Sequence, residues 1–342
     1  MDGYIWGRGA LDVKSGMAMM VAAFLRAKAD NLVPAGDILL LAECDEEARS
    51  NYGAKFLVEQ HAHQFDGVRY ALGEFGGFPM SISGVKFYLI QVAEKQACWM
   101  KATVRGPGGH GSLPMRDGTM ARLGQMITTL NRNRLPVHIT PAVRTMFNAL
   151  SAHLPFPQNL ILRQMLNPSF TDRLIDLMGE RGRLFEPLLH NTVNATIVRG
   201  GEKVNVIPSQ IELELDGRLL PGFTGEDMLS ELYRLLGDLA EIQVLLYDEY
   251  PTEPDLGLFD LLAGVLKEAD PQGIPIPYVI PAVTDAVYFA RLGIQTYGFI
   301  PMNLPDGFDF FNTIHAADER IPVEALEFGT RAIYRVLERY HP

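Results

Sequence analysis

The stretch LLLAECDEEARSNYGAK, residues 39–55, places an apolar run directly before three consecutive acids. Its apolar part, residues 38–43, has the length and composition of a strand buried in a parallel sheet. Such a strand, ending in Asp45, Glu46 and Glu47, brings like charges to one point. Ligands of open α/β sheets bind outside the carboxyl ends of the strands, so this strand end is a candidate binding site.

The segments on either side of this run, and those near the C-terminus, alternate between helical and strand patterns. This alternation predicts an α/β fold, with a mixed sheet flanked by helices. The helices are expected over residues 14–30, 54–64, 256–269 and 322–340, and the strands over 38–43, 68–73, near 278 and over 296–300.

The sequence pattern changes in the middle of the chain. Residues 88–106 alternate between apolar and polar side chains, which is typical of antiparallel strands. An amphipathic helix near 120–131, two strands within 201–222, a helix over 226–239 and a strand over 242–247 follow. This order is a split βαβ plan. We therefore predict an inserted α+β, ferredoxin-like domain over residues 97–248, with a helical insert near 141–190, inside a domain formed by 1–96 and 249–342.

The composition limits the classes of partner. The 342 residues carry a net charge of -11 without any Lys/Arg-rich run, which excludes an electrostatic footprint for nucleic acid or anionic lipid. The longest apolar run, residues 17–25, is too short to span a bilayer. Cys44 and Cys98 suggest neither a disulfide framework nor a thiolate cluster, so carboxylates and histidines must hold any metal. We expect a small-molecule substrate and a cytoplasmic location.

Two further acids are expected near the first strand end. Asp12 follows the glycines of GRGALDVKSG, just before a helix, and Glu74 follows the strand over 68–73. Carboxylates that converge in a partly dry cleft repel one another by roughly several kcal/mol unless a cation lies among them. From the residues alone, Asp12 is as compatible with a helix N-cap, and Glu46 and Glu47 with a solvated helix N-terminus.

His315 is the histidine with the most informative context. In NTIHAADERIPVEAL it lies in a loop before the last helix, with Asp318 and Glu319 following as first-turn acids or caps. A lone loop histidine is more often structural than a metal ligand. The others are interpreted as structural or surface residues, apart from His110, and they are His61, His63, His138, His153, His190 and His341.

Six motifs, in order and spacing, resemble those of the co-catalytic zinc aminopeptidase-like amidohydrolases. That family includes carboxypeptidase S, glutamate carboxypeptidase, the aminoacylases and succinyl-diaminopimelate desuccinylase. The helical insert and RLPVHITP are most similar to the branch of carboxypeptidase S and the N-acyl-amino-acid hydrolases. The motifs are DGYIWGRGALDVKSGMA, LAECDEEARSNYGAKFL, ALGEFGG, VRGPGGHGS, VNVIPSQIELELDGRLLPG and HAADERIPV.

The resemblance implies zinc-dependent hydrolysis of an amide bond in peptides or N-acyl amino acids that carry a free carboxylate. It implies that Asp12 bridges two zinc ions, that Glu47 and His315 complete one site, and that Glu74 belongs to the other. Glu46 corresponds to the general base, which takes a proton from the attacking water and returns it to the leaving amine.

The resemblance also implies that the inserted domain is a lid through which the protein forms a homodimer. His110, in GGHGS, matches a histidine that stabilises the oxyanion across the dimer, and Asn205 and Arg218 match substrate-binding residues. The residues alone favour simpler readings: a solvated loop histidine, a turn residue and an ion-paired surface arginine. Thr284 and Asp285 could line the pocket, but we expect them to cap a helix.

One departure from the family pattern concerns the second metal. The family carries a His-x-Asp motif on a strand before GRG, and this sequence contains no His-x-Asp. We therefore expect a chain that lacks the family's N-terminal strands, leaves apolar surface uncovered, and binds one zinc ion with impaired activity. Two alternatives remain: an inactive dimerising or ligand-binding fragment, and an aminopeptidase or dipeptidase of the same family.

Overall fold

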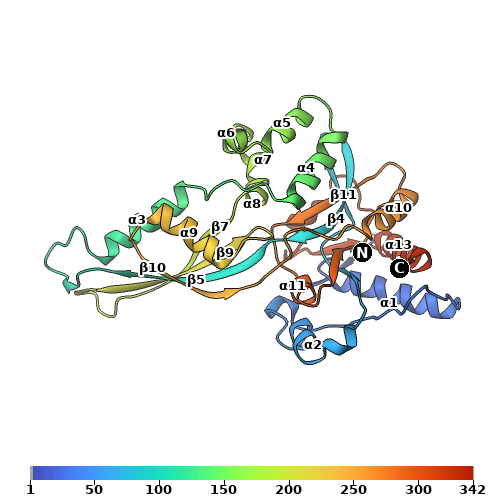
Figure 1. Cartoon of the computed structure of the whole chain (residues 1–342), viewed down its shortest axis with the longest axis horizontal. Coiled ribbons are helices and arrows are strands. Elements are labelled where there is room, and N and C mark those ends of the chain that lie inside the picture. The colour runs from blue at the N-terminus through green and yellow to red at the C-terminus, as the bar shows by residue number, and fades with distance from the viewer. Residues whose placement is uncertain (1–2, 342) are drawn as a thin grey trace.

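The computed structural model describes residues 3–341 and shows an elongated molecule built around two main sheets. Figure 1 shows the five-stranded sheet at the broad end, near both termini, and the four-stranded sheet forming a narrow arm. The mixed α/β class expected from the sequence is confirmed. No helix within residues 3–341 combines the length and apolar character needed to cross a bilayer.

The five-stranded sheet is mixed, with the order β11–β4–β12–β2 and with β3 also paired to β4. Both faces of β4 are buried: Phe87 and Leu89 belong to one apolar cluster, and Tyr88 and Ile90 to another. The second cluster includes residues of α10 (Phe259–Ala269) and α13 (Val323–Arg339), and α13 also packs on α1 (Lys14–Ala29). The strands are β2 (Tyr70–Gly73), β3 (Phe78–Ile82), β4 (Val85–Glu94), β11 (Ile274–Ile280) and β12 (Gln295–Gly298).

The four-stranded sheet is antiparallel, with the order β10–β5–β9–β7. With α3 (Thr119–Arg132) between β5 and β7, and α9 (Gly225–Leu236) between β9 and β10, it has the split βαβ order expected from the sequence. Side chains that alternate along β5 and β9 share an apolar cluster with both helices. The strands are β5 (Gln96–Arg105), β7 (Thr192–Arg199), β9 (Gln210–Leu219) and β10 (Glu241–Tyr247).

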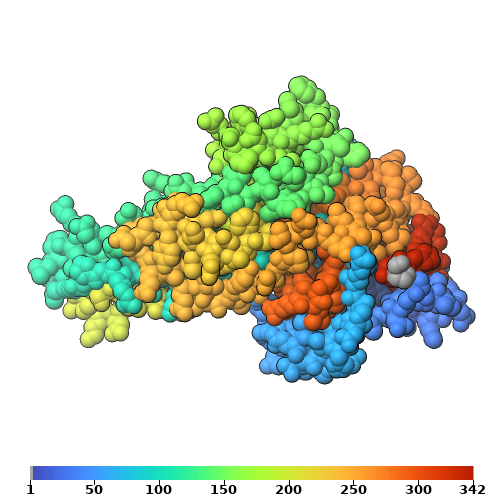
Figure 2. All heavy atoms as spheres, viewed as in Figure 1, coloured from blue at the N-terminus to red at the C-terminus, as the bar shows by residue number. Residues whose placement is uncertain are grey.

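The helical insert packs against the five-stranded sheet. Helix α4 (Pro141–His153) lies on β11, and Phe147 and Leu150 share an apolar cluster with Val279 and Ile280. Figure 2 shows the helices that follow, in green, as a projection above the arm. Helix α4, which the predicted division places with residues 97–248, thus packs on the five-stranded sheet. The helices that follow it are α5 (Gln158–Met165), α6 (Pro168–Met178), α7 (Glu180–Arg183) and α8 (Glu186–Leu189).

Short elements carry the loops that matter for the site. Two small antiparallel pairs join distant segments, namely β1 (Tyr4–Trp6) with β13 (Arg320–Pro322), and β6 (Gly109–His110) with β8 (Val206–Ile207). The remaining short elements are α2 (Ala54–Gln60), α11 (Ala286–Ala290), α12 (Phe310–Thr313) and the 3-10 turns Glu46–Ala48 and Ala62–Phe65.

The predicted strand over residues 38–43 is wrong. These residues lie outside every sheet formed by residues 3–341, and Leu39 and Leu41 expose 53% and 37% of their surface. An apolar run becomes a buried strand only when neighbouring strands pair with it, and none does so here. The acids at 45–47 consequently lie on a 3-10 turn and not at a strand end.

Candidate metal and catalytic site

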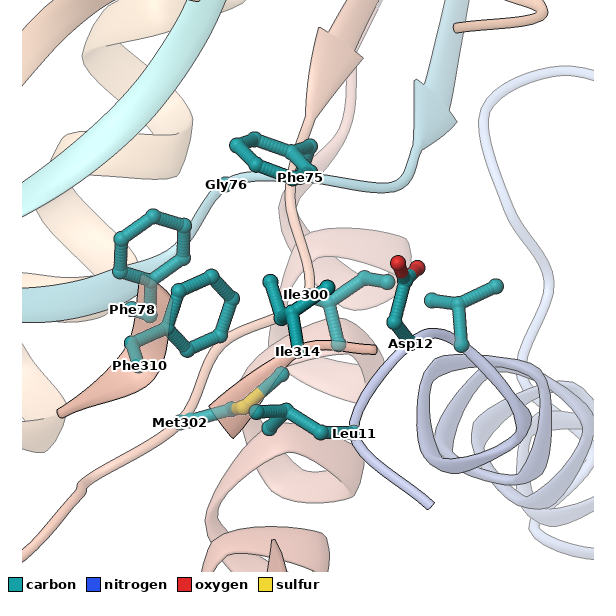
Figure 3. Close-up of a pocket in the computed structure, with 10 residues that line it drawn as sticks. Leu11, Asp12, Phe75, Gly76, Phe78, Ile300, Met302, Phe310 and Ile314 are labelled. Atoms are coloured by element: carbon teal, nitrogen blue, oxygen red, sulfur yellow. The ribbon is translucent and has the colours of Figure 1, made fainter. Parts of the chain in front are cut away.

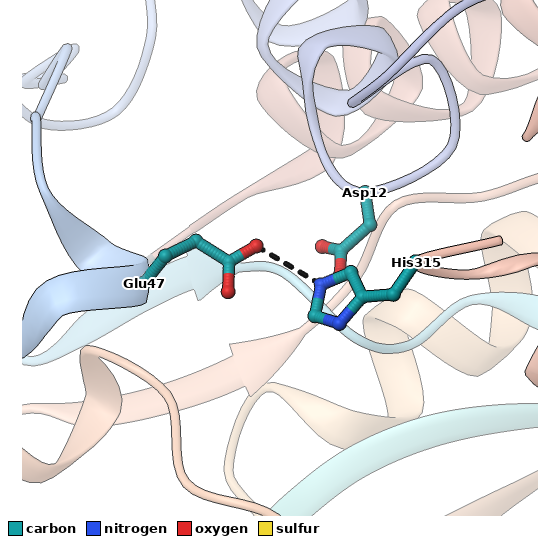
Figure 4. Close-up of side chains that lie close together, drawn as sticks. All are labelled: Asp12, Glu47 and His315. Carbon is teal, nitrogen blue, oxygen red and sulfur yellow. Dashed lines mark hydrogen bonds and ion pairs between the residues drawn. The ribbon is translucent and has the colours of Figure 1, made fainter. Parts of the chain in front are cut away.

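Three predicted metal ligands from distant parts of the sequence meet at one point. Asp12 lies between β1 and α1, Glu47 in the 3-10 turn, and His315 between α12 and β13. Nε2 of His315 is 3.2 Å from Oδ2 of Asp12 and 3.0 Å from Oε1 of Glu47. Figure 4 shows the imidazole directed towards both carboxylates. One donor atom from each residue lies within 4.8 Å of the others.

Glu319 fixes the loop that carries Asp12. Its buried carboxylate accepts hydrogen bonds from the backbone N–H groups of Gly9, Leu11 and Asp12, at 2.9, 2.9 and 3.0 Å. Burial alone would raise the pKa of Glu319, but these three bonds and nearby Arg8 bring its pKa below the ordinary value. Because its bonds go to the Asp12 loop, Glu319 orients a predicted ligand, and it is neither the first-turn acid nor the cap of the last helix.

The 3-10 turn separates Glu46 from Glu47. Asp45 and Arg49, which flank it, have left-handed backbone conformations with φ of 54° and 74°. The side chain of Glu47 is 62% exposed and points towards His315. The side chain of Glu46 is partly buried and shares a hydrogen bond with that of Glu74. Adjacent acids thus face different groups.

Burial and mutual repulsion raise the pKa values of the acids around this turn. Burial, with repulsion from Asp285, Glu47 and Asp12, raises the pKa of Glu46 to about 7. Burial and the charges of Glu46 and Asp12 raise that of Glu74 to about 9. The pKa of Asp12 is also raised, chiefly by burial. A divalent cation among these groups would offset the repulsion.

The residues present fit one divalent metal ion. Two carboxylates and one imidazole are donors that Zn²⁺ uses in proteins, and three protein ligands leave a coordination position open for water or substrate. Asp12, Glu47 and His315 form the one group of three such donors found within residues 3–341. Glu74 lies outside that group, and Asp12 with Glu74 alone would give a second ion two protein ligands.

The predicted substrate and oxyanion residues lie elsewhere. Nδ1 of His110 is 2.7 Å from Oγ of Ser112, and the backbone N–H of Gly111 donates to the carbonyl of Asn205. Figure 1 shows segments 106–118 (teal) and 200–206 (yellow-green) at the free end of the arm, far from α1. Arg218, on β9, is ion-paired with Asp216 at 2.8 Å. One copy of the chain therefore does not bring His110 and Asn205 to the Asp12 group.

An apolar pocket lies beside Asp12. Figure 3 shows the carboxylate of Asp12 at one side, with Ile300 and Ile314 next to it and the aromatic rings across the pocket. Phe78 and Phe310 are stacked with ring centroids 3.8 Å apart. The cavity of about 10 Å³ is close to the volume of one water molecule's probe sphere. Its apolar side chains exclude water from one side of Asp12, and the cavity is too small for a substrate side chain.

A group of acids behind the turn was not predicted from the sequence. Asp285 accepts a hydrogen bond from the hydroxyl of Ser50 and shares one with Glu43, whose pKa is raised to about 8 by burial and by Asp285. Asp285 makes no capping bond to α11, so the cap prediction is wrong for it, whereas Thr284 accepts from the N–H of Ala286. The available signal was an acid, Glu43, inside an apolar run.

The model of peptidase family M20/M25/M40 matches residues 1–339. The chain belongs to this family. It is therefore a hydrolase of a metallopeptidase family, as the resemblance implied.

Named relatives support this assignment. The chain is 28% identical to human N-fatty-acyl-amino acid synthase/hydrolase PM20D1, over 98% of this chain and 68% of the relative. It is 23% identical to probable carboxypeptidase S-like 2 of Dictyostelium discoideum, over 94% of this chain and 63% of the relative. These names agree with the carboxypeptidase S and N-acyl-amino-acid hydrolase branch.

Solved structures share the fold. The M20 family metallo-carboxypeptidase Sso-CP2 from Sulfolobus solfataricus matches with a TM-score of 0.66 and 17% identity, over 99% of this chain and 78% of its own. Human carnosine dipeptidase 1 matches with a TM-score of 0.59 and 15% identity, over 99% of this chain and 74% of its own.

Proposed function

We propose that the protein hydrolyses an amide bond in peptides or N-acyl amino acids with a free carboxylate, with Zn²⁺ held by Asp12, Glu47 and His315. The observation that carries this proposal is the placement of these three donors within 4.8 Å of one another. The partly buried acid Glu46 directly precedes Glu47 in the chain. The printed names of the human and Dictyostelium relatives support this class of substrate.

The chemistry divides between the metal and the residues of the chain. A bound divalent cation lowers the pKa of a water ligand and polarises a carbonyl. Glu46 serves as the general base, because it is a partly buried acid adjacent in the chain to the proposed ligand Glu47. It takes the proton of the attacking water and donates it to the nitrogen of the broken amide. Asp12 and Glu47 orient the reacting groups from two sides of His315.

Glu74 and Asp12 would hold a second zinc ion less firmly. Glu74 shares a hydrogen bond with Glu46, so an ion beside Glu74 would also be close to the base. With two protein ligands this site is incomplete, since structural and catalytic zinc sites have three or four. We therefore expect one firmly bound ion per chain.

Arg218, Asn205 and His110 complete the site in our proposal, the last two from a second copy. Arg218 offers a guanidinium that binds a carboxylate in two places. Its pairing with Asp216 means that substrate must compete with an internal acid. The position of residues 106–118 and 200–206 at the end of the arm suits contact with another molecule (Figure 1).

The edge strand β7 supports a homodimer. It lies at the edge of the four-stranded sheet, and its last six residues, 194–199, are exposed. An exposed edge of this length is a template for pairing with another strand.

We also propose a cytoplasmic location, which agrees with the exposed thiol of Cys44, since that thiol is not in a disulfide.

A substrate panel tests the proposed function. N-acyl amino acids and blocked dipeptides would be compared with the same compounds carrying a C-terminal amide, with and without a zinc chelator. We expect hydrolysis only of compounds with a free carboxylate and only without chelator. Equal hydrolysis of the amidated compounds would contradict the carboxylate requirement, and unchanged rates in chelator would contradict metal dependence.

A further inference from the structure

Arg49, which ends the turn that carries Glu46 and Glu47, contacts residues outside that turn. Arg49 has a left-handed backbone with φ of 74°, and its carbonyl accepts a hydrogen bond from the hydroxyl of Tyr288 at 2.9 Å. Its guanidinium donates to Oδ2 of Asp248 at 2.6 Å. Residues with positive φ other than glycine persist only where surrounding contacts hold them. The contacts of Arg49 are therefore candidates for what fixes this turn.

Asp248 lies directly after a strand of the four-stranded sheet. It follows β10 directly, at the point where the chain leaves the four-stranded sheet, and its backbone N–H donates to the carbonyl of Ala97 on β5. Its side chain is only 3% exposed. The guanidinium of Arg49 also lies 5.0 Å from the ring centroid of Trp99 on β5. One side chain from the turn thus contacts β5 and the residue that directly follows β10.

The charges make this contact specific. A buried carboxylate requires a cation, and Arg49 supplies the close one, whereas Arg291 lies 3.6 Å from the other oxygen of Asp248. Arg291 directly follows α11. Asp285, which directly precedes α11, accepts a hydrogen bond from the hydroxyl of Ser50. The turn, α11 and the base of the arm therefore meet at Asp248.

We propose that Arg49 and Asp248 form a clamp that positions the Glu46–Glu47 turn and couples it to the orientation of the four-stranded sheet. Arg49 is a positioning residue in this proposal, since it acts through Glu46 and Glu47 and is not among the three metal donors. The clamp gives the arm a direct mechanical connection to the proposed base and metal ligand. The proposal rests on the proposed function for the roles of those two acids.

The test compares Arg49→Met, Arg49→Lys, Asp248→Asn and the double variant Arg49→Met/Asp248→Asn in the full-length protein. Arg69→Met is the matched control, because Arg69 forms a pair with Asp255 at 2.8 Å that is largely exposed. The readouts are amide hydrogen exchange of residues 44–53, zinc affinity by competition with a chromophoric chelator, and Tm.

We expect Arg49→Met and Asp248→Asn each to speed exchange over residues 44–53 by about 10-fold or more, since the turn opens locally. Zinc affinity should fall by about 10-fold, the usual effect of removing an outer partner of a metal site. The double variant should match either single variant, because the two groups act as one unit. Arg49→Lys should recover part of the affinity, and Arg69→Met should change neither readout.

Unchanged exchange over residues 44–53 in Arg49→Met would overturn the clamp, as would additive effects in the double variant. A fall in Tm with zinc affinity within about twofold of the wild-type value would reduce the pair to an ordinary stabilising contact. If the wild-type protein binds no zinc, the proposed function fails, and the exchange measurement still decides whether the clamp holds the turn.

Discussion

Two groups of predicted site residues differ in how the fold treats them. Asp12, Glu47 and His315 come from distant parts of the chain and meet within 4.8 Å. His110 and Asn205 belong to segments 106–118 and 200–206, which a backbone hydrogen bond from Gly111 to Asn205 joins and which lie at the free end of the arm (Figure 1). One folded chain therefore brings together the proposed metal donors, whereas the proposed catalytic set needs another copy or a large movement of the arm.

The largest expected effect is that of Glu46→Gln. The amide keeps the shape of the side chain but cannot take a proton, so amide hydrolysis should fall by about 1,000-fold or more, within the range known for essential catalytic groups. Zinc per chain should stay unchanged, because Glu46 is not among the three donors. Rates are compared under saturating substrate. Retained activity would remove Glu46 from the mechanism.

His110→Ala should lower kcat by about 100-fold, the effect of losing one oxyanion donor. The variant should bind zinc normally, because His110 is not among the three donors. Mixing it with Glu46→Gln separates a second copy from a movement of the arm. A heterodimer would hold one site with both groups intact, so activity should reappear on mixing. No recovery, with subunit exchange verified, would mean that His110 acts within its own chain or not at all.

Glu319→Gln should weaken zinc binding by about 10-fold, with activity falling in proportion. The amide can accept fewer of the hydrogen bonds that Glu319 receives from Gly9, Leu11 and Asp12. Isothermal titration with zinc measures the change. Glu253→Gln, at an exposed position, is the control. Equal affinity in the two variants would show that the Asp12 loop keeps its shape without this carboxylate.

Glu94→Gln should give the smallest effect, confined to stability. Burial raises the pKa of Glu94 from 4.5 to about 8, against hydrogen bonds from Thr284 and Gln91. A raised carboxyl pKa contributes stability that is complete below pH 4.5 and is lost as the pH rises through 8. The Tm of the variant minus that of the wild type should therefore rise steadily from pH 5 to pH 8, by roughly 3 °C or more, and stay constant above that. A Tm difference that does not vary with pH would contradict the assignment.

The sequence predicted those features that depend on local pattern. The helix over 14–30 corresponds to α1 (Lys14–Ala29), and Glu74 directly follows β2. Asp12, Glu47 and His315 could be proposed as ligands because their motifs keep the order and spacing of a known family. Each of these inferences uses residues that are close in the chain or matched as a set.

Features that depend on distant partners could not be predicted. Residues 38–43 have a strand-like composition, but a strand exists only where another pairs with it. Glu319 was interpreted as a first-turn acid or helix cap, because nothing near it in the sequence indicates that it accepts a hydrogen bond from Gly9, 310 positions away. The packing of α4 on β11 likewise joins segments far apart in the chain.

In our proposal, Asp12, Glu47 and His315 hold a metal ion within a single folded chain. Elemental analysis of dialysed wild-type protein and of His315→Ala tests it most directly. We predict about one zinc ion per wild-type chain, lost in His315→Ala because two carboxylates alone are too few ligands. A wild-type protein without zinc, or a variant that keeps the wild-type content, would contradict the assignment of this site.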